Sequence, residues 1–339
     1  PEPATSMVHD AIGDDVLWSC LTCAACLDAC PVEINPIDSI VDMRRFLTLE
    51  EASTPDSAQS ALQSIEQRGH PWRGTTLTRT SWMDGLDIPT LAEKPESEVL
   101  FWVGCSGALV QRGVDTTRSM ASVLHKAGID FAVLGDEETC TGDPARRLGN
   151  EYLFQIQAET NIGTFKQYDV KKIITTCPHC FNTMKNEYPQ LGGNYDVIHY
   201  TAFVGDLLKE GKLKPTEAGI GKIGTVTYHD SCYLGRHNGE FGAPREIMSS
   251  IPGLDFVEMD RNQEQAFCCG AGGGRMWMEE EGERVNHMRT DQFLETGADT
   301  VAVSCPFCIQ MFDEGIGSKG EEDGKKAVDL ISILDQATE

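Results

Sequence analysis

Residues 171–180, KKIITTCPHC, and residues 299–308, DTVAVSCPFC, share one pattern that decides the fold. Each stretch contains a short run rich in Ile, Val and Thr, which leads directly into a Cys-Pro-x-Cys motif. Such a run is typical of a buried strand. The paired cysteines would then follow the carboxyl end of the strand, where open α/β sheets bind their ligands.

The two stretches belong to a longer internal repeat. The separation is 128 residues for three pairs of cysteines and 127 for a fourth pair, namely Cys140 and Cys268, Cys177 and Cys305, Cys180 and Cys308, and Cys105 and Cys232. Chance does not space four pairs so evenly, so the chain carries two copies of one unit. We place the first copy at 97–217 and the second at 222–339.

Strands and helices alternate within both copies. In the first copy the pattern predicts strands at 98–105, 129–135, 170–177 and 195–200, and helices at 116–128, 147–167 and 201–211. In the second copy it predicts strands at 224–232, 254–259 and 299–305, and helices at 243–253 and 275–297. This order is typical of the α/β class with mostly parallel sheets. The cysteine groups would therefore converge on one rim of each sheet.

A different cysteine motif precedes the repeats. The stretch SCLTCAACLDACP, residues 19–31, has the C-x2-C-x2-C-x3-C-P spacing of a bacterial ferredoxin [4Fe–4S] run, with Cys20, Cys23, Cys26 and Cys30. In two-cluster ferredoxins the fourth cysteine serves the other cluster, so two runs are expected, and this chain has one. We predict that the first three cysteines bind one cluster whose fourth ligand lies elsewhere, and that Cys30 serves a second cluster.

The segment around this motif is predicted to form a unit of its own. Residues 1–50 are interpreted as half of a helical ferredoxin-like [4Fe–4S] domain, because Ile37, Ile40, Val41 and Phe46 have helical spacing. Residues 51–96 are polar and contain several prolines. They are interpreted as a linker with short helical pieces.

Composition excludes some classes of function. The chain has 339 residues, with 28 basic and 53 acidic side chains and a net charge of -25. That balance argues against binding to nucleic acid and against docking on anionic lipid through a basic patch. It leaves open a role in solubility or a docking surface for a basic partner. No apolar run has the length of a membrane span, and the polar start is not a signal peptide and lacks an initiator Met, which suggests a processed chain or a fragment.

All 13 cysteines fall into three groups. Besides the ferredoxin run, the first copy offers four and the second copy offers five: Cys105, Cys140, Cys177 and Cys180, and Cys232, Cys268, Cys269, Cys305 and Cys308. In a long chain without a signal peptide, this pattern predicts metal binding in a reducing compartment. Thiolates select zinc, Cu(I) or iron–sulfur clusters, and the four thiolates of the first copy would also suit structural zinc.

Two further features are candidates for a supporting role. The glycine run GAGGG, residues 270–274, could place its backbone N–H groups on cluster sulfurs. A dinucleotide loop is the less favoured alternative, because the spacing is not G-x-G-x-x-G and no acidic residue is placed as that fingerprint requires. Four histidines near the cysteines could orient a cluster, carry a proton or be hydrogen-bonded polar residues: His179, His199, His229 and His237.

With these motifs the sequence resembles a known family. Two copies of C…CC-G…C-P-x-C behind a ferredoxin run resemble the cysteine-rich (CCG) domains of heterodisulfide reductase catalytic subunits and related iron–sulfur oxidoreductases. The stretches that carry the resemblance cover nearly the whole chain: CLTCAACLDACPVEI, IVDMRRFL, ETCTGDPARRLGNEYLFQ, TTCPHCFNTMKNEYP, YHDSCYLGRHNG, APREIM and CCGAGGG. The similarity is greatest to membrane-bound iron–sulfur oxidoreductases that link electron-transfer flavoprotein to menaquinone.

The resemblance implies a redox relay. Electrons would pass between a soluble donor, electron-transfer flavoprotein or another soluble redox protein, and membrane menaquinone. Members of the family carry an N-terminal membrane part that binds haem b, followed by a ferredoxin domain with two cysteine runs. This chain begins between those runs, so the other half would lie upstream or in a partner chain. The segment would then be tethered or peripheral on the cytoplasmic side of the membrane.

The two copies differ at one position of the family pattern. Thr141 stands where the second cysteine of the doublet would be, whereas the second copy has both Cys268 and Cys269. The resemblance implies a noncubane cluster in the second copy, whereas the four thiolates of the first copy suit a [4Fe–4S] cluster or zinc. A thiol/disulfide reductase of the heterodisulfide type is the alternative function, although Thr141 argues against disulfide reduction at two sites. We assign relay or structure to the first site, and substrate contact or exchange with the donor to the second.

Overall fold

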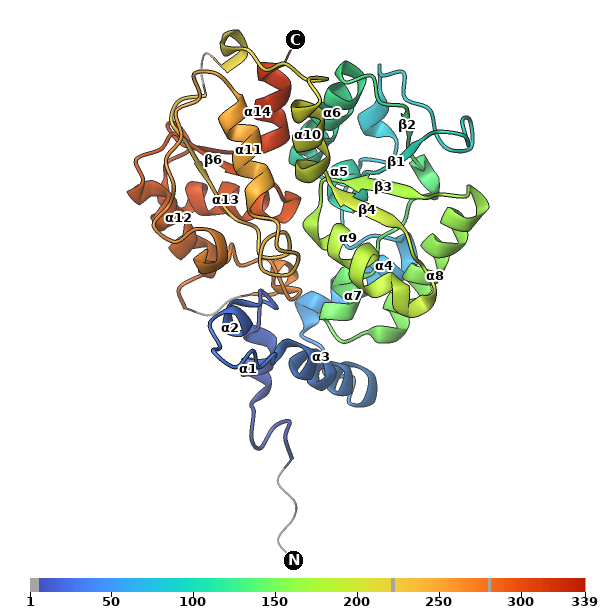
Figure 1. Ribbon diagram of the computed structural model, residues 1–339. Coiled ribbons are helices and arrows are strands. Elements are labelled where there is room, and N and C mark those ends of the chain that lie inside the picture. The colour runs from blue at the N-terminus through green and yellow to red at the C-terminus, as the bar shows by residue number, and fades with distance from the viewer. Residues whose placement is uncertain (1–5, 221–222, 280–281, 339) are drawn as a thin grey trace, which may run out of the picture.

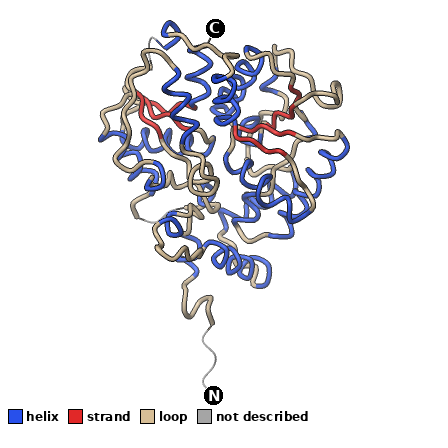
Figure 2. The backbone as a smooth tube through the Cα atoms, viewed as in Figure 1, coloured by secondary structure: helices blue, strands red, loops and turns tan. Residues whose placement is uncertain are grey.

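The computed structural model describes residues 6–220, 223–279 and 282–338. Two α/β units lie side by side, and the N-terminal segment packs against one end of both (Figure 1). Each unit contains one sheet (Figure 2), and the strands of both sheets are parallel. This arrangement confirms the predicted α/β class with two repeated units. The predicted boundaries at residues 1, 222 and 339 lie outside the described residues.

The sheet of the first copy has four strands in the order β2-β1-β3-β4. They are β1 (Val99–Trp102), β2 (Phe131–Ala132), β3 (Lys172–Thr175) and β4 (Asp196–His199). All four side chains of β1 are buried, as expected for a strand in a parallel sheet that helices cover on both faces. Because β1 and β3 are neighbours in the sheet, the cysteine motifs that follow them emerge at the same edge.

Helices connect these strands. They are α5 (Gly104–Leu109), α6 (Gln111–Lys126), α7 (Asp143–Arg147), α8 (Glu151–Gln167), α9 (Pro178–Asn182) and α10 (Tyr200–Lys209). The side chain of Asn150 caps α8 by accepting the N–H of Leu153. Gly128, with a φ of +67°, takes the left-handed conformation that commonly follows a helix such as α6.

The sheet of the second copy has three strands in the order β5-β6-β7. They are β5 (Val226–Tyr228), β6 (Thr300–Val303) and β7 (Lys326–Asp329). The helices of this copy are α11 (Gly242–Ser250), α12 (Val285–Glu295), α13 (Pro306–Lys319) and α14 (Leu330–Ala337). Strand β7 and helix α14 repeat β4 and α10, and neither is among the elements expected from the sequence.

Two expectations for the second copy are wrong. The predicted strand at 254–259 forms a single parallel bridge, between Phe256 and Val226. The predicted helix at 275–297 forms only from Val285 onward, and its residues 280–281 lie outside the described ones. A 3-10 turn precedes it, at Arg275–Trp277. Gly282 has a φ of +78°, a left-handed conformation that a continuous right-handed helix does not contain.

The N-terminal segment is helical, and a buried arginine anchors it. Its helices are α1 (Asp14–Ser19), α2 (Ala25–Asp28) and α3 (Ile37–Arg45), and a π-helical turn follows at Phe46–Glu50. Arg44 of α3 is fully buried and donates hydrogen bonds to four backbone carbonyl oxygens, those of Leu17, Cys20, Arg147 and Gly273. These carbonyls belong to the segment itself, the first copy and the second copy, so one guanidinium ties the three parts together.

Residues 51–96, interpreted from the sequence as a linker, contribute to the core. They contain α4 (Asp56–Arg68), whose buried face carries Ala58, Ala61, Leu62 and Ile65. Trp82 is also buried and packs edge-on against Phe101 of β1, with ring centroids 6.2 Å apart.

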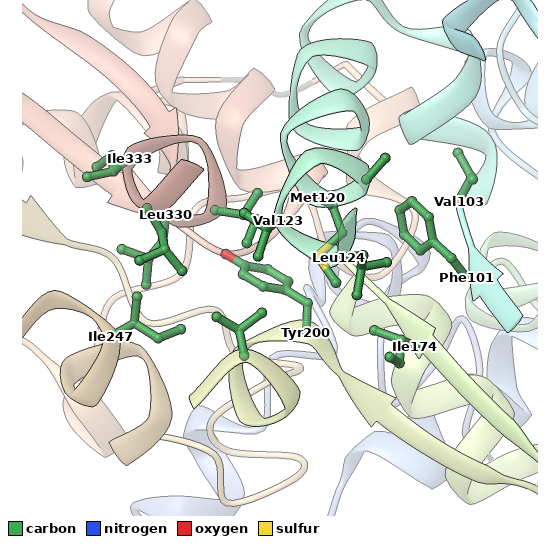
Figure 3. Close-up of a cluster of buried hydrophobic side chains, with 14 of the residues drawn as sticks. Phe101, Val103, Met120, Val123, Leu124, Ile174, Tyr200, Ile247, Leu330 and Ile333 are labelled. Carbon is green, nitrogen blue, oxygen red and sulfur yellow. The ribbon is translucent and has the colours of Figure 1, made fainter. Parts of the chain in front are cut away.

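The two units share a hydrophobic core. Side chains of α6 and α10 in the first copy meet those of α11 and α14 in the second, and Tyr200 lies among them (Figure 3). The Tyr200 hydroxyl donates to Asp329 Oδ1 at 2.6 Å and lies 2.8 Å from Ser304 Oγ. Within the described residues, no helix is both long and apolar enough to cross a membrane.

Candidate functional site

The four cysteines of the first copy lie together beyond β1 and β3. Cys105 lies in the first turn of α5, Cys177 directly precedes α9, and Cys180 lies in the first turn of α9. The Cys105 thiol raises the pKa of Cys140, and burial together with the Cys180 thiol raises the pKa of Cys177. All four cysteines are buried and line one cavity. The structure therefore brings together the complete predicted first site.

The five cysteines of the second copy are arranged in the same way. Cys305 directly precedes α13, and Cys308 lies in its first turn. The sulfurs of Cys308 and Cys269 are 3.3 Å apart, and Cys232 and Cys268 pack together in one buried cluster. All five cysteines are buried. A buried set of thiolates of this kind is chemically suited to an iron–sulfur cluster.

Thr141 occupies the place of the doublet cysteine in space as well as in sequence. Its Oγ1 lies 3.9 Å from Cys180 Sγ, just as the sulfur of Cys269 faces that of Cys308. The backbone around the two positions is alike, because the N–H of the next glycine lies 3.4 Å from the sulfur of the preceding cysteine in both copies, for Gly142 and Cys140 and for Gly270 and Cys268. The copies thus differ by a hydroxyl in place of a thiol, and a hydroxyl is a poor ligand for soft metals.

The two cysteine sites adjoin across the boundary between the copies. Burial, the hydrogen bond with Cys180 and the charge of Cys305 all raise the pKa of Cys177. The middle residues of the two Cys-Pro-x-Cys motifs, His179 and Phe307, lie with their ring centroids 4.8 Å apart. Phe307 also lines the cavity of the first site. The two sites are therefore neighbours, although their motifs are far apart in the sequence.

A buried ionic network holds His179 between the sites. Its Nδ1 lies 3.1 Å from Asp143 Oδ2, and Arg147 Nε donates to Asp143 Oδ1 at 3.0 Å. Burial alone would raise the pKa of Asp143, but His179 and Arg147 hold it at about 2. The imidazole ring stacks on Tyr233, with centroids 4.1 Å apart. Asp143 and Tyr233 were not among the residues singled out from the sequence.

His199 and His237 take hydrogen-bonded positions in the protein matrix. The Nδ1 of His199 accepts the N–H of Thr201 at the start of α10, and burial lowers the pKa of His199 to about 3. His237 Nε2 donates to the carbonyl of Thr22 at 2.8 Å, and burial lowers the pKa of His237 to about 4. Both rings are therefore neutral at pH 7. They fit the interpretation as hydrogen-bonded polar residues better than a role in orienting a cluster or carrying a proton.

The ferredoxin run lies against the second copy. A hydrogen bond with Cys268, together with burial, raises the pKa of Cys23. Arg236 donates to the carbonyl of Cys23 at 2.8 Å. Burial raises the pKa of Cys20, and the charges of Cys23 and Cys26 raise it further. Cys30 instead accepts backbone hydrogen bonds, the first from the N–H of Ile34, which lower its pKa.

The glycine run brings the ferredoxin run and the second copy into contact. A Cβ atom on Gly272 would lie 2.2 Å from the Leu21 carbonyl oxygen, and one on Gly273 would lie 2.3 Å from that of Cys20. Only glycine allows so close an approach. The N–H of Gly270 meanwhile lies 3.4 Å from Cys268 Sγ. Backbone N–H groups on the sulfurs of candidate ligands favour the cluster interpretation of this run over a dinucleotide loop.

Buried donors near both sites lack a partner in the described part of the chain. They include His229 Nε2, Arg289 Nη2 and Trp102 Nε1. Trp102 Nε1 and Cys180 Sγ both lie within 4 Å of the position that a Cβ atom on Gly104 would take. Unpaired buried donors are rare, and N–H groups commonly bond to the sulfurs of iron–sulfur clusters. The residues at both sites therefore fit such a cluster.

Comparison with known proteins matches both repeats to one domain family. Residues 99–185 and 226–313 each match the cysteine-rich domain called CCG. Over 340 residues, 98% of this chain and 48% of the relative, the sequence is 44% identical to the "Probable iron-sulfur-binding oxidoreductase FadF" of Bacillus subtilis. It is 40% identical to the "EtfAB:quinone oxidoreductase" of Syntrophomonas wolfei, over 98% of this chain and 48% of that protein.

A third relative is covered over most of its length. It is a subunit of the dihydromethanophenazine:CoB--CoM heterodisulfide reductase of Methanosarcina barkeri, which is 34% identical over 93% of this chain and 76% of that protein. By contrast, the chain spans about half the length of the first two relatives, at 48% of each.

Proposed function

Because this chain belongs to the CCG-domain iron–sulfur oxidoreductases related to heterodisulfide reductase, we propose that it passes electrons between electron-transfer flavoprotein and membrane menaquinone. Electron transfer through iron–sulfur clusters is the general function of the chain as a member of this family. The choice of donor and acceptor is supported by the relative named EtfAB:quinone oxidoreductase, which matches 98% of the chain.

The contact between the three cysteine groups carries the proposal. Cys23 of the ferredoxin run packs against the buried cluster of Cys232, Tyr233 and Cys268 at the second site. Burial raises the pKa of Cys177 in the first site, and the charge of Cys305 in the second site raises it further. Redox groups held at these cysteines would form a continuous series from the ferredoxin run into both copies. A relay requires such a series, whereas a lone structural metal does not.

We assign all 13 cysteines as cluster ligands. Cys20, Cys23 and Cys26 bind one [4Fe–4S] cluster, and Cys30 binds another whose remaining ligands lie outside this segment. The five thiolates of the second site suit a noncubane cluster, because they exceed by one the number that a closed cubane needs. The four thiolates of the first site suit a closed [4Fe–4S] cluster or zinc.

Exposed apolar side chains around the ferredoxin run support a docked partner segment. Met7, Val16, Val32 and Ile34 are 65%, 60%, 71% and 64% exposed, and Cys26 is also exposed. Apolar surface of this kind commonly marks an interface. We assign it to the other half of the ferredoxin domain, which would connect to the haem- and quinone-binding membrane part in the same polypeptide or in a partner chain. The segment would then sit on the cytoplasmic side of that membrane.

The proposal is tested with the intact protein, reduced electron-transfer flavoprotein and a menaquinone analogue. We expect flavin reoxidation coupled to quinol formation, and no quinol without the flavoprotein. Failure with that donor, together with turnover of a disulfide, would favour the heterodisulfide-type alternative. Metal analysis of the intact protein addresses the first site: apart from haem iron, about sixteen iron atoms fit the four four-iron clusters assigned above, whereas one zinc with about twelve iron atoms fits structural zinc at the first site.

A further inference from the structure

An imidazole and a guanidinium form a buried pair beside the second site. His229 directly follows β5, and Arg289 belongs to α12; their exposed fractions are 1% and 0%. Arg289 Nε donates to His229 Nδ1 at 3.2 Å. Since an arginine side chain has only donors, Nδ1 of this histidine must be the acceptor. The neutral ring therefore carries its hydrogen on Nε2.

The remaining donors of this pair lie at the cysteines. His229 Nε2 and Arg289 Nη2 have no protein partner within the described ranges. A ring nitrogen of His229 and the sulfurs of Cys269 and Cys308 lie within 4.8 Å of one another. Burial lowers the pKa of Arg289, and the negative charge of the Cys269 thiolate opposes this shift, so the two charges attract each other. The pair thus presents N–H groups and a positive charge to the second cysteine site.

The other hydrogen-bond partners of Arg289 do not neutralise its positive charge. Its Nη1 donates to neutral oxygens, the carbonyl of Arg261 and the amide of Gln292, at 3.0 Å and 2.6 Å. The negative charge of Asp230 also opposes the lowering of the Arg289 pKa by burial. The two carboxylate oxygens of Asp230, however, already accept hydrogen bonds from the terminal nitrogens of Arg245, at 2.8 Å and 3.0 Å. A buried cation is screened little by solvent ions, so its field reaches the nearby thiolates.

The first copy has neutral groups at the corresponding positions. Trp102 precedes His229 by 127 residues, and Asn161 precedes Arg289 by 128. Trp102 Nε1 is likewise a buried donor without a partner in the structure as described. Asn161 donates to the Cys140 carbonyl at 3.0 Å and carries no charge. Each site therefore has a ring N–H donor without a described partner at the matched strand position, but only the second has a cation in the repeated helix position.

We propose that His229 and Arg289 donate hydrogen bonds to sulfurs of the second-site cluster and raise its reduction potential above that of the first site. The inference rests on the proposed assignment of clusters to the two sites. On reduction the cluster gains one electron and no proton, so its negative charge grows by one. Nearby N–H donors and a cation stabilise that added charge. An electron shared between the two sites then rests on the second.

The first test is an EPR-monitored redox titration of the intact, cluster-loaded protein. Arg289→Gln should weaken one-electron reduction of the second cluster at least tenfold, which lowers its potential by about 59 mV. Arg289→Lys keeps the cation and should retain most of the wild-type potential. Trp102→Phe is the matched control, because it should shift only the signal of the first site. An unchanged second-site potential in Arg289→Gln, or equal shifts at both sites, would overturn the proposal.

The second test does not depend on how well the arginine variants fold. His229→Phe keeps an aromatic ring but loses the donor, and should also lower the second-site potential. In protein labelled with 15N-histidine, electron–nuclear double resonance should show a weak coupling that this variant removes. The strong coupling of a nitrogen bound directly to iron would overturn the donor role. Neither measurement requires flavoprotein or quinone. Both can therefore support this proposal even if the proposed electron donor and acceptor are wrong.

Discussion

A single functional group separates the two cysteine sites at the scale of residues. Thr141 and Cys269 occupy matched positions, and each faces the last cysteine of its own motif. We expect Cys269→Ser to alter the EPR spectrum of the second cluster and to abolish turnover, because a hydroxyl is a poor ligand for soft iron. Thr141→Cys is the control, and turnover should stay largely intact because the first site already has four thiolates. Full activity and an unchanged spectrum in Cys269→Ser would mean that the difference carries no chemistry.

Asp329 makes the stability of the shared core depend on pH. Burial raises its pKa from 3.8 to about 7. Between these values the folded state binds more protons than the unfolded state, so stability falls as pH rises from about 4 to about 7. Asp329→Asn keeps an acceptor for the Ile331 N–H and the Tyr200 hydroxyl but does not titrate. We expect its stability relative to the wild type to rise over this range by roughly 1–4 kcal/mol. The apparent Tm at pH 5 and pH 8 measures this, and a constant difference between the proteins would contradict it.

The sequence identified the cysteines more readily than the residues that support them. Thiolate spacing is diagnostic on its own, so the structure gathers the cysteine groups as the repeat predicts. Arg289 and Asp143 carry no such signature, because a charged residue in a helix is usually at the surface. Both are nevertheless buried. Only the offset of the repeat, which aligns Arg289 with Asn161, could have pointed to a difference between the copies.

At the scale of elements, prediction succeeded where a run is buried on both faces. Strands β1, β3 and β6 are short apolar runs, with every side chain of β1 and β6 buried, and such runs stand out in a sequence. Strand β7 begins and ends with charged residues, Lys326 and Asp329, so it shows no continuous apolar run. The stretch at 254–259 has apolar residues but lies beside β5 through one bridge only. Whether this stretch forms a strand depends on its pairing with a neighbouring strand in the folded protein, and the local sequence pattern does not reveal that pairing.

The glycine run should be needed for docking the ferredoxin run. Gly273 has a φ of +64°, and a Cβ atom there would lie 2.3 Å from the Cys20 carbonyl oxygen. We expect Gly273→Ala to destabilise this contact by roughly 1–3 kcal/mol and to speed amide hydrogen exchange in residues 17–30. Gly324→Ala is the control, because a Cβ atom on Gly324 meets nothing within 4 Å. Equal exchange in the two variants would show that the close approach does not hold the run in place.

At the scale of the whole molecule, one buried side chain connects the three parts. Arg44 donates to carbonyls of the N-terminal segment, the first copy and the second copy. In Arg44→Met these buried carbonyls lose their donors, at a cost of about 1–3 kcal/mol each. We expect limited proteolysis to release the N-terminal segment much faster than in the wild type. Arg45→Met removes a partly exposed ion pair with Glu151 and should have little effect. Similar release from both variants would contradict the anchoring role of Arg44.

The arrangement of the three parts also predicts a magnetic interaction. Cys23 packs against the buried cluster that contains Cys232 and Cys268, so a cluster held by the ferredoxin run and a cluster in the second copy would be close neighbours. Dipolar coupling between two electron spins falls with the cube of their distance. The EPR spectrum of the fully reduced protein should therefore show split signals whose splitting is independent of microwave frequency.

Removing one ligand at a time distinguishes this interaction from other causes of splitting. Cys23→Ser should eliminate the cluster of the ferredoxin run and remove the splitting that this cluster adds to the second-site signal. Cys30 accepts backbone hydrogen bonds and is assigned to another cluster, so Cys30→Ser should keep the splitting between the ferredoxin run and the second copy. If Cys30→Ser also removed it, Cys30 would close the same cluster as Cys23. The ferredoxin run would then be complete in itself, and no ligands from outside this segment would be required.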